Sequence, residues 1–136
     1  MSELYLIDTS ALIRFYCGTS GSEWDQAVNA GLVGICEPVR QEFLRAVGGT
    51  PAYHEADGLL RDTFPYYAMR DSAWDDTAIL QRDLANRGMH QCAGPVDLLV
   101  AVTAVHHKLT LLHQDADFEA IARHTGQPEQ RIFDSS

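Results

Sequence analysis

The chain has 136 residues, of which 46% are hydrophobic and 21% charged, and this length and composition are typical of one soluble globular domain with a single core. No apolar run approaches the roughly 20 residues that cross a bilayer, and no basic segment followed by an apolar stretch indicates a signal peptide, so we expect a cytoplasmic protein that binds no membrane. The net charge of −9 argues against broad electrostatic binding of nucleic acid, although it allows a local basic rim around an acidic, metal-filled centre.

The first half of the chain alternates buried-type strands with helices. In chain order it predicts a strand over residues 4–7, helices over 10–16 and 23–30, a strand over 32–36, and helices over 38–47 and 51–63. Pro38 suits the first position of its helix, and Gly48 and Gly49 suit the end of that helix.

The second half continues this alternation. It predicts a strand over residues 66–69, a helix over 72–87, a strongly apolar helix over 95–106, a strand over 110–112, a helix over 116–125 and a last strand over 131–133. Strands separated by helices form parallel sheets that are covered on both faces. We therefore expect an α/β fold with three α/β/α layers.

Five acidic residues are expected at one edge of this sheet. Asp8 directly follows the first strand, Glu42 lies in the first turns of the helix after the second strand, and Asp97 lies in the first turn of the apolar helix. Asp115 and Asp117 follow the fourth predicted strand. Because sites in open parallel sheets form outside the carboxyl ends of the strands, these carboxylates are expected to converge.

Four of these acids also have a structural explanation. Asp8 and Asp115 can cap the helices that follow them. Asp97 and Asp117 lie in first helical turns, where the helix dipole favours a negative charge. Taken singly, each of these positions is therefore a weak signal of function.

Glu42 is harder to explain by structure alone. Its helix is expected to bury an apolar stripe made of Val39, Phe43 and Ala46. Glu42 falls inside that stripe, where a charge is costly unless it is paired or bound to a cation. Asp97 is likewise a lone charge at the start of a buried helix.

The acids together predict a metal site. Three or four carboxylates at the same end of a sheet repel one another strongly unless cations lie among them. Carboxylate oxygens with room for water suit Mg²⁺ or Mn²⁺. Such a site activates water and neutralises phosphate in an in-line displacement, so no side-chain nucleophile is needed.

Three stretches carry a family resemblance: LIDTSALI, EPVRQEFLR and GPVDLLVAVTAVHHKLTLLHQDADFEAIA. They resemble PIN-domain ribonucleases, and most of all the VapC-like toxins of type II toxin–antitoxin systems. The resemblance covers nearly the whole chain, so residues 1–136 are expected to form a single PIN-like nuclease domain. It implies an α/β/α sandwich with a five-stranded parallel sheet, RNA cleavage that depends on Mg²⁺ or Mn²⁺, and a homodimer neutralised by a small antitoxin protein.

The resemblance also assigns residues. The family's acidic quartet matches four positions of this sequence: Asp8, Glu42, Asp97 and Asp115. Asp117 matches a further acid often found two positions after the quartet's last member. Ser10 matches a hydroxyl that commonly supports the first aspartate.

Roles follow for each of these residues. The first metal is expected to be held, directly or through water, by three carboxylates: Asp8, Asp97 and Asp115. Glu42 is expected to hold a metal-bound water or a second metal, and Asp117 to be a further ligand or to support one. Arg14 lies one helical turn after Ser10 and is a candidate RNA contact through a phosphate.

One alternative of a different class stays open. The domain could be a catalytically idle PIN-like binding module, whose acidic pocket holds a basic partner segment. The four mutually repelling carboxylates argue for an active nuclease instead, since an idle pocket has no need of them. The preference for RNA over DNA rests on the resemblance alone.

Overall fold

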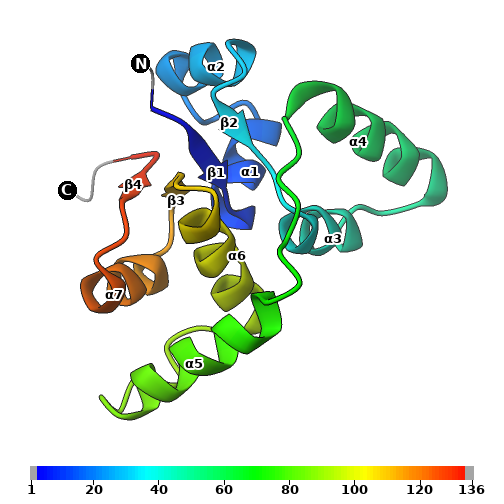
Figure 1. Cartoon of the computed structure of the whole chain (residues 1–136). Coiled ribbons are helices and arrows are strands. Elements are labelled where there is room, and N and C mark those ends of the chain that lie inside the picture. The colour runs from blue at the N-terminus through cyan, green and yellow to red at the C-terminus, as the bar shows by residue number, and fades with distance from the viewer. Residues whose placement is uncertain (1–2, 134–136) are drawn as a thin grey trace.

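The computed structural model describes residues 3–133 of the chain. A parallel sheet surrounded by helices organises the fold (Figure 1). The strands are β1 (Tyr5–Ile7), β2 (Val33–Gly34), β3 (Thr110–His113) and β4 (Glu129–Arg131). Their order is β2-β1-β3-β4, and every neighbouring pair is parallel. The chain therefore places β2 on one side of β1 and then crosses over to place β3 on the other side. The strands β1 and β3 lie side by side at the centre of the sheet.

The strand expected over residues 66–69 forms only a single bridge. Ile35, just after β2, pairs in parallel with Tyr66. The segment then turns towards the end of helix α6, where the His107 ring contacts the Ala68 carbonyl oxygen at 2.7 Å. The prediction of a five-stranded sheet is therefore wrong, because residues 3–133 contain four strands and the fifth segment is drawn away by contacts with a helix.

Seven helices surround the sheet within the described residues: α1 (Thr9–Tyr16), α2 (Ser22–Asn29), α3 (Glu37–Arg45), α4 (Thr50–Thr63), α5 (Ala73–Ala85), α6 (Pro95–His106) and α7 (Ala116–Thr125). Figure 1 shows α6 in front of the central strands and α1 behind them, with α5 packed on the outer side of α6. This arrangement agrees with the expected α/β/α layers. No helix in this part of the chain is long and apolar enough to span a membrane.

Helix α6 shows why the core lies at the centre of the molecule. Its residues 98–104 are all buried, because the helix packs between the sheet and α5 and so needs apolar side chains all round. Beneath it, Leu6 of β1 and Leu111 of β3 are at most 1% exposed. The N-terminus of α6 therefore stays fixed against the carboxyl ends of β1 and β3.

The last strand is shifted from its expected position. It was expected over residues 131–133, but β4 spans Glu129–Arg131, which pairs with β3 from Leu111 to His113. The apolar character of Ile132 favoured the wrong boundary, because the register of a short edge strand is fixed by its partner rather than by its own residue types.

Candidate functional site

Asp8 lies at the point where β1 ends and α1 begins. It is 4% exposed and caps α1, since its Oδ1 accepts the Ala11 backbone N–H at 2.9 Å. Burial raises the pKa of Asp8 to about 6, while hydrogen bonds from Ala11 and Ser10 oppose that rise and the charge of Asp97 adds to it. The carboxylate is thus both a helix cap and a buried negative charge that faces another acid.

Ser10 joins the two central strands. Its hydroxyl lies 2.8 Å from both carboxylate oxygens of Asp8, to which it donates, and its Oγ accepts the backbone N–H of Gln114 at 2.9 Å. Gln114 directly follows β3. Ser10 therefore links the first acid to the loop that carries the last two.

The closest group of acids comes from the start of α6 and the start of α7. Oxygen atoms of three carboxylates lie within 4.8 Å of one another: Asp97, Asp115 and Asp117. Asp115 caps α7, and its Oδ1 accepts the backbone N–H of Asp117 at 2.9 Å. Each acid thus has its expected place at a helix start, yet the three meet in one cluster, which we call the acidic triad.

Burial and like charges raise the pKa values of two triad members, Asp97 and Asp117. The pKa of Asp97 is raised to about 6, first by burial and then by three carboxylates: Asp115, Glu42 and Asp117. Burial, and then the charge of Asp115, also raises the pKa of Asp117. A bound cation would reverse these effects, because it stabilises the ionised carboxylates.

Glu42 approaches the site from α3, on the solvent side. Its carboxylate accepts a hydrogen bond from the Thr9 hydroxyl at 2.5 Å, and its charge acts on Asp97. The expectation that Glu42 falls within a buried stripe is wrong: Val39 and Phe43 are buried, but Glu42 itself is exposed. Ala46 is exposed too, because α3 ends at Arg45. Glu42 therefore owes its place to the site edge and not to the core.

The donor set fits a hard divalent cation. All the side chains that converge here offer carboxylate or hydroxyl oxygens, which Mg²⁺ and Mn²⁺ prefer. Among residues 3–133, no ion pair joins Asp8, Glu42 or any member of the triad to a lysine, arginine or histidine. The acids therefore have no ion-pair partner within this part of the chain.

Comparison with known proteins identifies the family of this chain. The family model described as "PIN domain" matches residues 5–124. The chain belongs to the PIN-domain family. It is 36% identical over 129 residues to "Ribonuclease VapC2" of Mycobacterium tuberculosis (strain CDC 1551 / Oshkosh), which covers 94% of this chain and 92% of that protein.

Further relatives place this PIN-domain protein among the VapC-like members. "Ribonuclease VapC21" of Mycobacterium tuberculosis is 29% identical over 132 residues, covering 97% of this chain and 96% of that protein. The toxin–antitoxin complex VapBC2 from Rickettsia felis, solved with a DNA fragment from its promoter, contains a chain of the same fold. That chain is 15% identical, its TM-score is 0.78, and the match covers 96% of this chain and 99% of that one.

Arg14 of this VapC-like protein lies on the exposed side of α1. Its guanidinium lies over the ring of Phe133, with its central carbon 5.9 Å from the ring centre. The backbone N–H of Phe133 donates to the side chain of Gln114 at 2.9 Å, next to the triad loop. Arg14 is thus near the site edge, and its contact with RNA stays a prediction.

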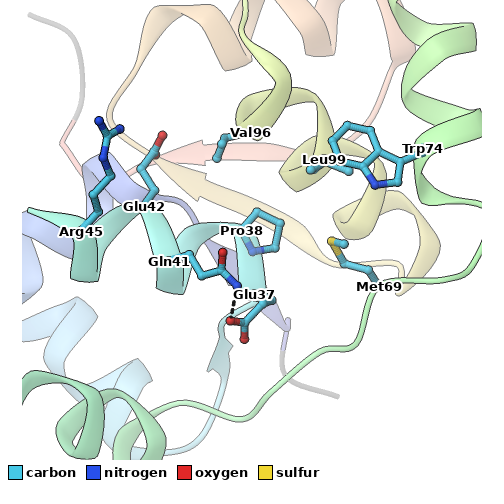
Figure 2. A pocket seen from close by; sticks show the side chains of 9 residues that line it. All are labelled: Glu37, Pro38, Gln41, Glu42, Arg45, Met69, Trp74, Val96 and Leu99. Atoms are coloured by element: carbon cyan, nitrogen blue, oxygen red, sulfur yellow. Dashed lines mark hydrogen bonds between the residues drawn. The ribbon is translucent and has the colours of Figure 1, made fainter. Parts of the chain in front are cut away.

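A pocket opens beside Glu42, between α3, α6 and the segment before α5 (Figure 2). It has a volume of about 540 Å³ and is lined by Glu37, Pro38, Gln41, Glu42, Arg45, Met69, Trp74, Val96 and Leu99. The Trp74 side chain is 62% exposed and forms one end of the pocket, opposite Glu42 and Arg45. Because Asp8 and the triad do not line it, the pocket adjoins the acids rather than containing them.

Sequence reasoning missed two supporting residues. Thr9 bonds Glu42, and only its position directly after Asp8 hinted at a role. His113 bonds the backbone of Asp115 through its ring at 3.1 Å. A histidine that continues the buried run Thr110–Leu112 was a signal for it, but a search for metal-ligand spacing does not find a residue that bonds to the backbone.

Proposed function

We propose that this VapC-like protein is a metal-dependent endoribonuclease that acts as the toxin of a toxin–antitoxin pair. The main observation behind this proposal is the acidic triad, with Asp8 and Glu42 beside it, at the carboxyl edge of a parallel sheet. Among residues 3–133, no lysine, arginine or histidine forms an ion pair with these acids. The ribonuclease names of its relatives support phosphodiester hydrolysis in RNA.

Mg²⁺ or Mn²⁺ would be held by carboxylates from three elements: Asp8, Asp97, Asp115 and Asp117, with Glu42 at the outer side. When bound, the metal supplies activation of water and neutralises charge on the scissile phosphate. The chain's own residues fix the geometry. Ser10 holds the Asp8 carboxylate, and Thr9 holds that of Glu42.

The substrate contacts proposed here lie around the acids. Arg14 on α1 and Arg45 on α3 are both exposed. Arg45 lines the pocket together with Glu42, so a phosphate near the acids has a cation close by (Figure 2). These contacts supply the local basic rim that the overall charge of −9 does not.

The proposed partners are a small antitoxin protein and a second copy of this chain. Solved complexes of the same fold are VapBC toxin–antitoxin assemblies, for example those from Rickettsia felis and Salmonella typhimurium. Exposed apolar side chains on α5 and α6 favour a homodimer: Trp74, Ile79 and Val105. Light scattering of the isolated chain tests whether it forms a dimer. We propose that the protein acts in the cytoplasm, where it would meet its RNA substrate.

The test is cleavage of total cellular RNA by the purified, antitoxin-free protein with Mn²⁺. We expect discrete fragments from the wild type and from Asp75→Asn, a control that removes an exposed carboxylate of α5 away from the site. Asp8→Asn is expected to give none. Equal cleavage by Asp8→Asn would contradict the proposal and point to a contaminating nuclease. No RNA cleavage by any sample would favour the catalytically idle binding module.

A further inference from the structure

His113 is a buried histidine that the proposed reaction does not use. It is the last residue of β3, it is 0% exposed, and it stands two residues before Asp115. Its ring packs against Phe118 of α7, with the ring centres 5.5 Å apart. A polar ring at the end of a wholly buried strand needs hydrogen-bond partners for its nitrogens.

The first reason is the backbone of a triad member. The Nδ1 atom of His113 accepts the backbone N–H of Asp115 at 3.1 Å. A ring nitrogen can accept only when it carries no proton, so this bond requires the tautomer with its proton on Nε2. The bond fixes the direction in which the chain leaves β3.

The second ring nitrogen faces the edge strand. Nε2 of His113 lies 3.5 Å from Oε2 of Glu129 on β4, which suits an Nε2 that bears the proton. Arg131, also on β4, is paired with another acid, because it donates a hydrogen bond to Glu119 at 2.6 Å. Glu129 is therefore left to face the histidine and to favour the required tautomer.

The bond to Asp115 matters because the next bond depends on it. Once the Asp115 backbone is directed by His113, its carboxylate caps α7 by accepting the Asp117 N–H. The positions of two triad carboxylates, those of Asp115 and Asp117, thus depend on the same turn of the chain. Hydrogen bonds of this kind orient the ligand side chains before a cation binds.

We infer that His113 is a positioning residue, whose unprotonated Nδ1 holds the turn of Asp115 and Asp117 so that their carboxylates face Asp97. This inference rests on the proposed function, since it assigns the histidine a role towards the metal. His113 then contributes to the cation affinity of the site through the backbone of Asp115.

Two substitutions separate positioning from packing. In His113→Asn the side-chain amide oxygen is bonded to Cγ, as Nδ1 is, so an acceptor stays near the Asp115 N–H. In His113→Gln the amide lies one bond further out, nearer the place of Nε2, and that acceptor is lost. Both variants remove the ring that packs on Phe118, so both should lower the thermal midpoint of the metal-free protein to a similar extent.

The readout is Mn²⁺ affinity, measured by titration of the thermal midpoint and by calorimetry. We expect His113→Asn to bind within about 3-fold of the wild type and His113→Gln to bind about 10- to 100-fold more weakly, the usual effect of losing a group that orients a ligand. Equal affinities in the two variants would overturn the inference. A wild type that binds no Mn²⁺ would instead overturn the proposed metal site, and the inference with it.

A second measurement needs no variant. Nitrogen NMR of the wild-type histidine rings, recorded with and without Mg²⁺, reports which nitrogen of His113 carries the proton. We expect an unprotonated Nδ1 and a protonated Nε2 in both samples. A proton on Nδ1 would overturn the inference whatever the variants show, because that nitrogen could not then accept from Asp115.

Discussion

Two buried aspartates of this protein, Asp8 and Asp57, are stabilised in opposite ways. They are 4% and 8% exposed. Asp57 on α4 contacts two guanidinium groups, that of Arg40 at 3.2 Å and that of Arg61 at 2.8 Å. Among residues 3–133, Asp8 receives only neutral donors, from Ser10 and Ala11, and the charge of Asp97 acts on it.

The difference shows which of the two regions is built to receive something. A buried carboxylate is costly unless a positive charge or strong hydrogen bonds compensate it. Between α3 and α4 the chain supplies that charge itself, through Arg40. At the carboxyl edge of the sheet, residues 3–133 form no ion pair with the acids, so the metal-free site keeps an electrostatic strain that a cation would relieve. Functional sites commonly keep such a cost to stability.

The largest expected effect comes from breaking the acidic side of this comparison. Asp97→Asn keeps the shape of the side chain but removes a charge from the triad. RNA cleavage should fall by about 1,000-fold, as when a group that stabilises transition-state charge is lost. The metal-free variant should be at least as stable as the wild type, because it no longer repels Asp115.

Activity and thermal unfolding are measured on the same sample of Asp97→Asn. A variant that aggregates or melts far below the wild type would mean that Asp97 is structural, and the assignment would be wrong. Asp75→Asn is the control, since it too removes a carboxylate from a first helical turn, but an exposed one outside the triad.

The sequence predicted the elements that local rules control. The helices over 95–106 and 116–125 have the expected bounds, because Pro95 suits a first helical position and Asp115 caps the second helix. The strand over 66–69 failed, since Tyr66 forms one bridge before contacts with α6 draw the chain away. Long-range contacts of that kind leave no trace in residue type.

The candidate site was predicted in its chemistry and less well in its grouping. The order of the acids placed them after the strands, and β1 and β3 are indeed neighbours. The grouping of Asp117 with Asp97 depends on the turn at the start of α7, which the sequence does not specify. The reasoning about Glu42 assumed a helix long enough to bury Ala46, whereas α3 ends one residue earlier.

The next effect tests whether a cation supplies the charge that the site lacks. Mg²⁺ or Mn²⁺ should raise the thermal midpoint of the wild type, because a ligand that binds only the folded state stabilises it by mass action. At about 100 times Kd the gain is about 2.7 kcal/mol, or roughly 10 °C for a domain of this size. Asp97→Asn should lose most of the shift. No shift in the wild type at millimolar metal would count against the metal site.

A smaller effect is expected from pH in the metal-free protein. The pKa of Asp8 is raised from 3.8 to about 6 in the folded chain. The folded state therefore binds more protons than the unfolded state between these values, and the free energy of unfolding should fall as pH rises through them. From Asp8 alone we expect a loss of about 2 kcal/mol between about pH 4.5 and 7.5.

Urea unfolding in EDTA across that range measures the loss. Asp8→Asn has no carboxyl group to titrate, so the difference between the two curves isolates the contribution of Asp8. Asp97, whose pKa is also raised to about 6, should act in the same direction and stay in both curves. Parallel curves for wild type and variant would show that Asp8 is not strained, and the comparison with Asp57 would lose its basis.

The smallest effects come from the other side of the comparison, where two arginines contact one aspartate. The Arg40 side chain is 25% exposed and that of Arg61 is 73% exposed. Arg40→Met should lower the free energy of unfolding by about 1–2 kcal/mol, because it removes the positive charge that faces the buried Oδ1 of Asp57. Arg61→Met should cost less than about 0.5 kcal/mol, as exposed ion pairs do.

RNA cleavage should survive in both variants when each is assayed well below its thermal midpoint, because Asp57 already has its charge partner within the chain while the triad does not. A loss of cleavage in stable, folded Arg40→Met, with Arg61→Met unaffected, would mean instead that the α3–α4 ion pair sets the position of Glu42 and that the two regions act as one.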